Sequence, residues 1–143
     1  MKVIANDRPE EIEVLGKKKL VNFNMKEVTK ENEDGVAYTM YEYEQLKFSL
    51  TDTPKYIEDT VKEYKLNNLT VVTASGKVFY ADPSSRVDLG DAIAEAEVRG
   101  LTSTTWKLAE EFEGSRYAVV TIDELKEARG LALETKGNIV GAV

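Results

Sequence analysis

The chain has 143 residues, of which 42% are apolar and 31% charged, proportions typical of a folded globular protein. It contains no cysteine and no histidine, which excludes disulfides, zinc sites with Cys or His ligands, cysteine nucleophiles and imidazole bases. The net charge of −7 argues against a general nucleic-acid binder, because phosphate contact needs a concentrated basic surface.

Two features of the sequence bear on location. No apolar run approaches the roughly 18 residues that a membrane span requires. The acidic beginning, MKVIANDRPEEIEV, lacks the basic and then apolar pattern of a signal peptide. We therefore expect no membrane insertion and a cytoplasmic location at synthesis.

The first half of the chain predicts a long β-hairpin. Residues 1–16 come before it and are expected to be loosely ordered, with one short strand or a few helical residues. The three lysines at 17–19 are interpreted as a solvated turn, with a phosphate contact as the alternative. Apolar and polar residues alternate over residues 19–29 and again over residues 36–49, as in half-buried strands. Residues 30–35, which end in Asp-Gly, predict the turn between these strands.

The second strand of this hairpin changes the parity of its apolar residues around residues 42–44. Such a change indicates either a bulge that re-aims the strand or two faces that are both covered. The same strand is rich in the rigid amphipathic side chains that are enriched at protein interfaces. The sequence leaves open whether these residues pack in the core or form a partner surface: Tyr38, Met40, Tyr41 and Tyr43.

A helix is predicted to follow the hairpin. Thr53 is a plausible cap, Pro54 suits the first helical position, and Ile57 begins a stripe at helical spacing. Residues 1–67 therefore form a hairpin-plus-helix region. This region is small, so we expect it to pack against the following half or against another subunit.

Residues 68–136 predict an α+β domain of strand, strand, helix, strand, strand and helix. Ser75-Gly76 is a tight-turn pair between two short strands, and Asp82-Pro83 begins a helix that ends at Gly100. Strands are predicted over residues 104–108, which include Trp106, and over residues 117–121, with an acidic loop at residues 110–116.

The last helix is predicted to begin with a capping box at residues 121–124 and to reach about residue 134. Residues 137–143 then form an apolar tail that could add a strand to a neighbouring sheet, and its members complete the candidate partner surface: Ile139, Val140 and Val143. The fold class is α+β, with mostly antiparallel sheet and helices on one face.

Each motif that could carry chemistry has a structural explanation. Ser75-Gly76-Lys77 lacks the other residues of a phosphate-binding loop and is interpreted as a hairpin turn. Residues 31–34 lack the ligand spacing of a calcium loop, and adjacent carboxylates such as Glu110 and Glu111 arise by chance in so acidic a chain. Trp106, within a strand of threonines, is interpreted as a core residue rather than a ligand-stacking one. We predict no enzymatic activity, no cofactor, no metal and no small-molecule substrate.

Four segments, in a fixed order and spacing, carry a resemblance to a known family: TVVTASGKVFYAD at 70–82, DPSSR at 82–86, TTWK at 104–107 and VVTIDEL at 119–125. Over residues 69–133 the chain resembles uncharacterised domains borne by phages and prophages, often in proteins associated with tail and tail-fibre gene clusters. That family typically has an Asp-Asn-type turn soon after its tryptophan strand, where this chain has the longer AEEFEGSR at 109–116. The resemblance supplies no catalytic residues.

The resemblance implies a non-enzymatic phage or prophage protein, either a structural component of the tail and its adhesion apparatus or an assembly factor. Such a protein would bind other phage structural proteins or itself, would be synthesised in the cytoplasm of a bacterial host, and could end in the virion. The alternative is a small acidic prophage-encoded regulatory protein that binds a host protein.

Overall fold

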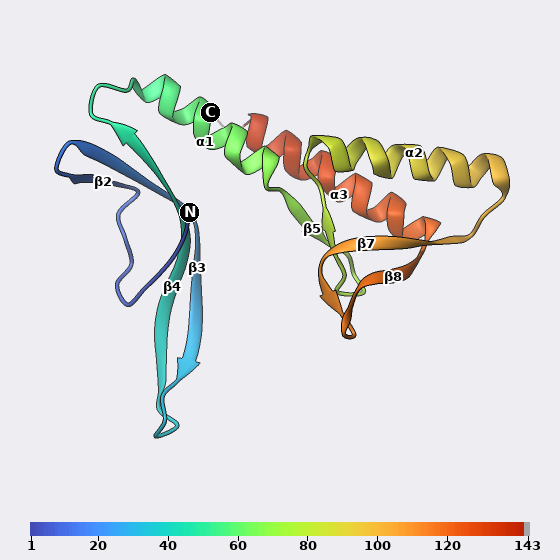
Figure 1. The fold of residues 1–143 in the computed structure, drawn as a ribbon, viewed down its shortest axis with the longest axis horizontal. Helices are drawn as coiled ribbons and strands as arrows, with labels where there is room; N and C mark the ends of the chain where they lie inside the picture. Colours follow the sequence, from blue (N-terminus) through green and yellow to red (C-terminus); the bar gives the residue numbers. More distant parts are fainter. Residues whose placement is uncertain (142–143) are drawn as a thin grey trace. The chain divides into compact units, whose positions relative to one another are not determined.

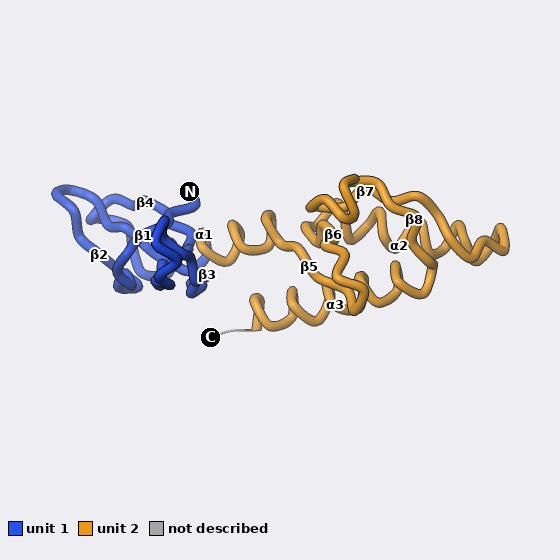
Figure 2. Tube along the Cα trace, turned by 90° about the horizontal axis from the view of Figure 1, so that it is seen from below, with its two compact units in different colours: residues 1–59 blue, residues 60–143 orange. Residues whose placement is uncertain are grey.

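The computed structural model describes residues 1–141 and divides into two compact units, residues 1–59 and the residues from 60 onward (Figure 2). The boundary lies inside α1 (Pro54–Asn67), whereas the sequence pattern placed it after this helix. The α+β fold class with antiparallel strands, predicted from the sequence, is confirmed (Figure 1). The described helices lack the length of apolar sequence that a bilayer crossing requires.

Unit 1 is built on a four-stranded antiparallel sheet with the order β1-β4-β3-β2. The predicted hairpin is confirmed as β3 (Lys18–Glu31) and β4 (Ala37–Ser49). The segment before it is more ordered than expected, because it holds two short strands where one was expected: β1 (Lys2–Ala5) pairs with β4, and β2 (Ile12–Leu15) pairs with β3. These short strands form because the central hairpin leaves two edges that can accept hydrogen bonds.

Asn22 holds the segment between β1 and β2 against the sheet. Its side chain is buried, its Nδ2 donates to the carbonyl of Glu10 at 2.8 Å, and its Oδ1 accepts from Nε2 of Gln45 at 2.9 Å. Its backbone N–H donates to the carbonyl of Glu11 at 2.8 Å. These bonds satisfy polar groups that would be costly to bury alone.

A β-bulge re-aims the central hairpin. Phe23 pairs with Glu44 and Lys26 with Glu42, so that two residues of β3 lie opposite Tyr43 alone. The extra residue is therefore in β3, although the parity change that predicted a bulge is in β4. Asn24 has a φ of 55°, in the left-handed region that asparagine tolerates better than most residues.

The helix predicted after the hairpin is confirmed at its start. The backbone N–H of Tyr56 donates to Thr53 Oγ1 at 3.2 Å, which is the expected cap, and Pro54 is the first helical residue. The ring of Tyr56 meets that of Phe48 edge to face, with centroids 6.2 Å apart, and Ile57 is buried. The first turn of α1 thus covers the base of the hairpin.

Unit 2 has the predicted order of elements: β5 (Thr70–Val72), β6 (Val78–Tyr80), α2 (Pro83–Arg99), β7 (Ser103–Phe112), β8 (Ser115–Thr121) and α3 (Ile122–Gly141). β5 pairs with β6 and β7 with β8, and both pairs are antiparallel. The two helices pack against these hairpins (Figure 1) around one apolar core. Its fully buried large members are Phe79, Leu89, Leu108, Val120 and Leu125.

Two boundaries in unit 2 differ from the sequence prediction. The expected acidic loop at residues 110–116 is mostly strand, because Phe112 pairs with Ser115 and only Glu113 and Gly114 turn the chain. Both have positive φ, 51° and 82°, as a tight two-residue hairpin turn requires. The final helix passes residue 134 and continues to residue 141, since no proline stops it and Gly137 costs only about 1 kcal/mol relative to alanine.

Replacing Asn24 tests the bulge. We expect Asn24→Val to lower the free energy of unfolding by about 1–2 kcal/mol, because a β-branched residue is strained at positive φ. Asn24→Gly should stay within a few tenths of a kcal/mol of the parent, since glycine adopts this conformation freely. Urea unfolding followed by far-UV circular dichroism measures both. Equal stability of the valine and glycine variants would show that the left-handed conformation is not required.

Candidate functional site

The β3–β4 arm, defined as residues 28–40, is the part of the central hairpin that extends beyond the short strands. β1 pairs with β4 only from Tyr41 onward, and β2 pairs with β3 only as far as Val21. Within unit 1 of the described chain, neither edge of the arm has a third strand beside it. The arm therefore presents backbone donors and acceptors along both edges.

The turn at the end of the arm is ordered by its own side chains. Asn32 Oδ1 accepts from the backbone N–H groups of Asp34 at 3.0 Å and Val36 at 2.9 Å. Gly35 has a φ of 76°, which glycine accommodates without strain. The oxygen that could have contributed to a calcium site is thus used inside the turn. Within residues 1–141 no group of three or more acidic side chains is arranged to hold a metal ion.

The four β4 residues of the candidate partner surface lie on two faces of the sheet. Opposed residues of an antiparallel pair share a face, so Tyr38 and Met40 lie on the face of Lys30 and Val28. Tyr41 and Tyr43 have the other parity and point to the opposite face. Tyr43 is only 7% exposed and belongs to the core, whereas Tyr38 is 41% exposed.

The C-terminal members of that candidate surface are also separated. Residues 137–141 lie in α3, so the predicted tail is helical and cannot add an extended strand there. Ile139 is half-buried, while Val140, the next residue around the helix, is 54% exposed. Val143 lies outside the described residues.

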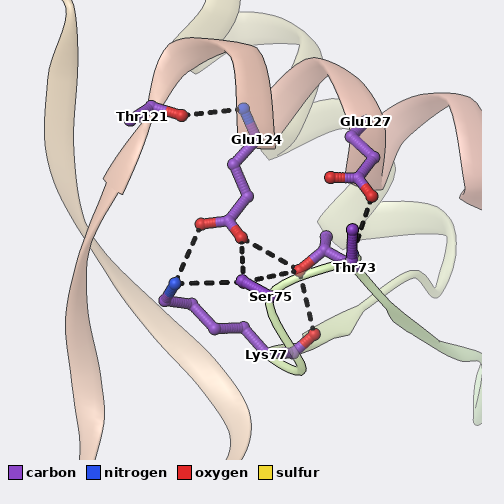
Figure 3. A network of polar contacts seen from close by, with 7 residues as sticks. Thr73, Ser75, Lys77, Thr121, Glu124 and Glu127 are labelled. Carbon is purple, nitrogen blue, oxygen red and sulfur yellow. Dashed lines mark hydrogen bonds and ion pairs between the residues drawn. The ribbon is translucent and has the colours of Figure 1, made fainter.

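A partly buried polar network connects the β5–β6 turn to the beginning of α3 (Figure 3). Oε2 of Glu124 accepts from the hydroxyls of Ser75 and, at 3.0 Å, Thr73. The Lys77 ammonium lies 3.2 Å from Glu124 Oε1 and 3.1 Å from Ser75 Oγ. Nearby, Glu127 Oε1 accepts the backbone N–H of Ala74 at 2.8 Å.

Of the two hydrogen bonds of the capping box predicted at residues 121–124, the structure has the one accepted by Thr121. Thr121 Oγ1 accepts the backbone N–H of Glu124 at 3.1 Å, as expected. The Glu124 carboxylate does not return to its own helix start but binds the turn of the other hairpin. The Thr121 cap thus fixes the backbone from which Glu124 reaches the turn.

The electrostatics of the network favour a charged pair. Burial disfavours the ionised form of Glu124, but hydrogen bonds from Ser75, Thr73 and Lys77, together with the charge of Lys77, lower its pKa overall. The Glu124 and Lys77 side chains are only 11% and 14% exposed. Lys77 also lies 4.7 Å from the centre of the Phe112 ring, a favourable cation–π geometry.

The contacts within this network determine which of its side chains are available to a ligand. The lysine of a phosphate-binding loop must reach a ligand, but Lys77 is occupied by a carboxylate, a hydroxyl and an aromatic ring. The Ser75 hydroxyl donates to the same Glu124 carboxylate, so it is also engaged within the protein. The cluster therefore supports the interpretation of Ser75-Gly76-Lys77 as a hairpin turn fixed to α3.

The remaining motifs lie apart from this network. Trp106 is half-buried: part of it packs against the core of unit 2, as its interpretation as a core residue predicts, and the rest stays accessible. Glu110 and Glu111 are exposed on β7. Asp82 is the cap residue of α2, and its carboxylate accepts the hydroxyls of Ser84 at 2.9 Å and Ser85 at 2.5 Å.

With this geometry established, the chain was compared with known proteins. No protein-family model, curated protein sequence or solved structure matches it. The resemblance to phage-borne domains over residues 69–133 stays a prediction that rests on the sequence segments alone.

Sequence reasoning missed two features of the structure. The pairing of Glu124 with the β5–β6 turn joins residues 49 positions apart, and no local pattern marks such a contact. The exposed edge of residues 37–40 depends on β1 pairing with β4 no further than Tyr41, and β1 was not predicted in full. One signal was present, because residues 37–40 carry no charge in a chain that is 31% charged.

Replacing Glu124 tests the network. We expect Glu124→Gln to lower the free energy of unfolding at pH 7 by about 1–3 kcal/mol, because Lys77 is left buried beside a neutral amide. The Glu124 pKa is lowered on folding, so its contribution is full above the ordinary glutamate pKa of about 4.3 and fades as pH falls through the folded value. The difference between parent and variant should therefore shrink on acidification.

Chemical denaturation between pH 3 and pH 7 measures this difference. Glu110→Gln is the matched control, since it removes the same charge from an exposed position and should change stability by less than about 0.5 kcal/mol. A Glu124→Gln variant as stable as this control at pH 7 would contradict the stabilising role of the network.

Proposed function

We propose that this protein is non-enzymatic and acts by protein–protein interaction through the β3–β4 arm. The observation that carries the proposal is the uncharged edge of β4 at residues 37–40, Ala-Tyr-Thr-Met, which pairs with no strand beyond β3 in the described part of unit 1. Natural proteins usually protect such an edge with charged residues, proline or a bulge. An unprotected edge is suited to pairing with another chain.

The energetics of the arm support this use. A two-stranded hairpin is marginally stable in water without a third strand or a packed face. Within the described part of unit 1 the arm has no third strand beyond Tyr41, and its side chains include the exposed Val36 and Tyr38. A strand from a neighbouring subunit would satisfy the free backbone groups of β4 and cover Tyr38 and Met40.

A second copy of this chain is the partner that the edge fits most directly. Two copies of residues 37–40 can meet about a two-fold axis in antiparallel register without placing like charges opposite each other. The outer edge of β3 is less suited to this pairing because it presents Lys30 and Glu31. Other phage structural proteins with an exposed strand remain the alternative partners.

The setting of this interaction is proposed from the sequence alone. The resemblance over residues 69–133 supports a phage or prophage protein, either in the tail and its adhesion apparatus or as an assembly factor. The runner-up is a regulatory protein of prophage origin that contacts a host protein through its acidic surface. A contact made by uncharged residues 37–40 would be nearly insensitive to salt, whereas an acidic surface would give association rates that fall steeply with salt.

A charge placed on the β4 edge tests the proposed contact. Thr39→Lys puts an ammonium on each of two edges that would meet, so we expect self-association to weaken about tenfold or more. Thr29→Lys is the matched control, because Thr29 is the direct partner of Thr39 on the same face but belongs to β3. Sedimentation velocity over a concentration series measures both variants.

Two outcomes would contradict the proposed self-association. The parent chain could remain monomeric at millimolar concentration, or both lysine variants could weaken association equally, which would assign the effect to net charge. Circular dichroism spectra matching the parent would confirm that the variants fold.

The proposed setting is tested by mass spectrometry of purified particles from a phage or induced prophage that encodes this chain. A structural component should be present at a fixed copy number relative to the other particle proteins, while an assembly factor should be found only in immature particles. Absence from both mature and immature particles would contradict the proposed phage role. It would leave the contact made by the β4 edge to be judged by sedimentation.

A further inference from the structure

A groove of about 480 Å³ in unit 2 runs beside β7, and it is independent of the β3–β4 arm. One wall consists of three consecutive residues of β7, Thr105, Trp106 and Lys107. Successive side chains of a strand point to opposite faces, so three in a row can line one cavity only if it follows the edge of the strand. The other edge of β7 is paired with β8, which places the groove at the edge that has no strand pairing; β6 lies close to β7 without pairing with it, and its Tyr80 also lines the groove.

The opposite wall belongs to α2 and is acidic. Ser85, Asp88 and Asp91 follow one another at intervals of three residues, so they lie along one face of the helix. Asp88 and Asp91 are exposed, and neither has an ion-pair partner within residues 1–141. Lys107 is the one cationic residue among those that line the groove. It pairs with Tyr117 of β8, so these two side chains lie on the same face of the β7–β8 pair.

Tyr80 also lines the groove and is held in place. Its hydroxyl accepts from Nη2 of Arg116, whose guanidinium also binds the carbonyl of Leu108 at 3.2 Å and lies 5.8 Å from the centre of the Tyr80 ring. Arg116 is thereby committed to the protein and does not neutralise the aspartates. The groove thus combines a strand edge, two aromatic side chains and two unpaired carboxylates.

We propose that this groove binds an extended segment of a partner protein that carries lysine or arginine at alternate positions. The backbone of the segment would add to the edge of β7 along Thr105, Trp106 and Lys107, where no strand is paired, as in other cases of β-strand addition. Side chains on one face of the added strand would point toward α2, where Asp88 and Asp91 complement a positive charge. The aliphatic part of each basic side chain would pack on Trp106 and Tyr80.

Three synthetic heptapeptides test this binding mode. Each is capped at both ends, has the form Thr-X-Val-X-Val-X-Thr, and carries lysine, glutamate or glutamine at X. Trp106 is the only tryptophan of the chain and lines the groove, so its fluorescence reports binding directly. The lysine peptide should bind at least about tenfold more tightly than the other two, since a tenfold ratio needs only about 1.4 kcal/mol.

Two further comparisons separate the charge from the strand edge. The double variant Asp88→Asn with Asp91→Asn should weaken binding of the lysine peptide about tenfold. The matched control Glu110→Gln with Glu111→Gln removes the same charge from β7 outside the groove and should bind within about twofold of the parent. A lysine peptide with N-methyl groups on alternate backbone amides keeps its charge but loses strand pairing, and it should bind about tenfold more weakly.

Four results would overturn the inference. These are no binding by any of the three peptides, equal binding of the glutamate peptide, equal weakening by the control variant, and undiminished binding of the N-methylated peptide. The last result would assign the groove to a compact cationic ligand instead of an extended chain. Variants that keep the parent circular dichroism spectrum are used throughout.

Discussion

The contact of Glu124 with the β5–β6 turn is the interaction on which unit 2 depends. β5 and β6 have three residues each, too few to persist as an isolated hairpin in water. Their turn is joined to α3 by Ser75, Thr73 and Lys77, which all contact one carboxylate. Phe79 of β6 belongs to the same core cluster as Leu125 and Ala128 of α3, so apolar packing and the ion pair both join this hairpin to α3. The charged pair is tolerable because its hydrogen-bonding groups find partners within the turn.

Local signals in the sequence predicted the elements that local interactions determine. Pro54 and Pro83 mark helix starts, and Gly100 ends α2 in the left-handed conformation with a φ of 67°. These residues act through their own backbone preferences, which do not depend on distant parts of the chain. The long β3–β4 hairpin was predicted for a similar reason, since its alternation and its Asp-Gly turn are adjacent in the sequence.

Features that depend on distant contacts could not be predicted. Ile12, Val14 and Leu15 remain exposed in β2, so this strand buries little of its own and forms because β3 offers an edge. Glu124 fits a capping box within its own helix, yet its carboxylate accepts hydrogen bonds from the hydroxyls of Thr73 and Ser75 in a distant turn instead. The split of the candidate surface between two faces follows from strand parity. The burial of Tyr43, which pairs with Val3 of β1, is not visible in the pattern of β4 alone.

The uncharged edge of β4 has a consequence for how the cell must handle this protein. An edge without charged residues does not discriminate between the correct strand and any other exposed strand, including those of partly folded chains. If the edge pairs as proposed, a copy without its partner exposes it and is prone to aggregation, whereas a copy in the complex has the edge covered. Because the proposed partner is a second copy of the same chain, the fraction of uncovered edges would fall as the concentration of the chain rises, since association follows mass action.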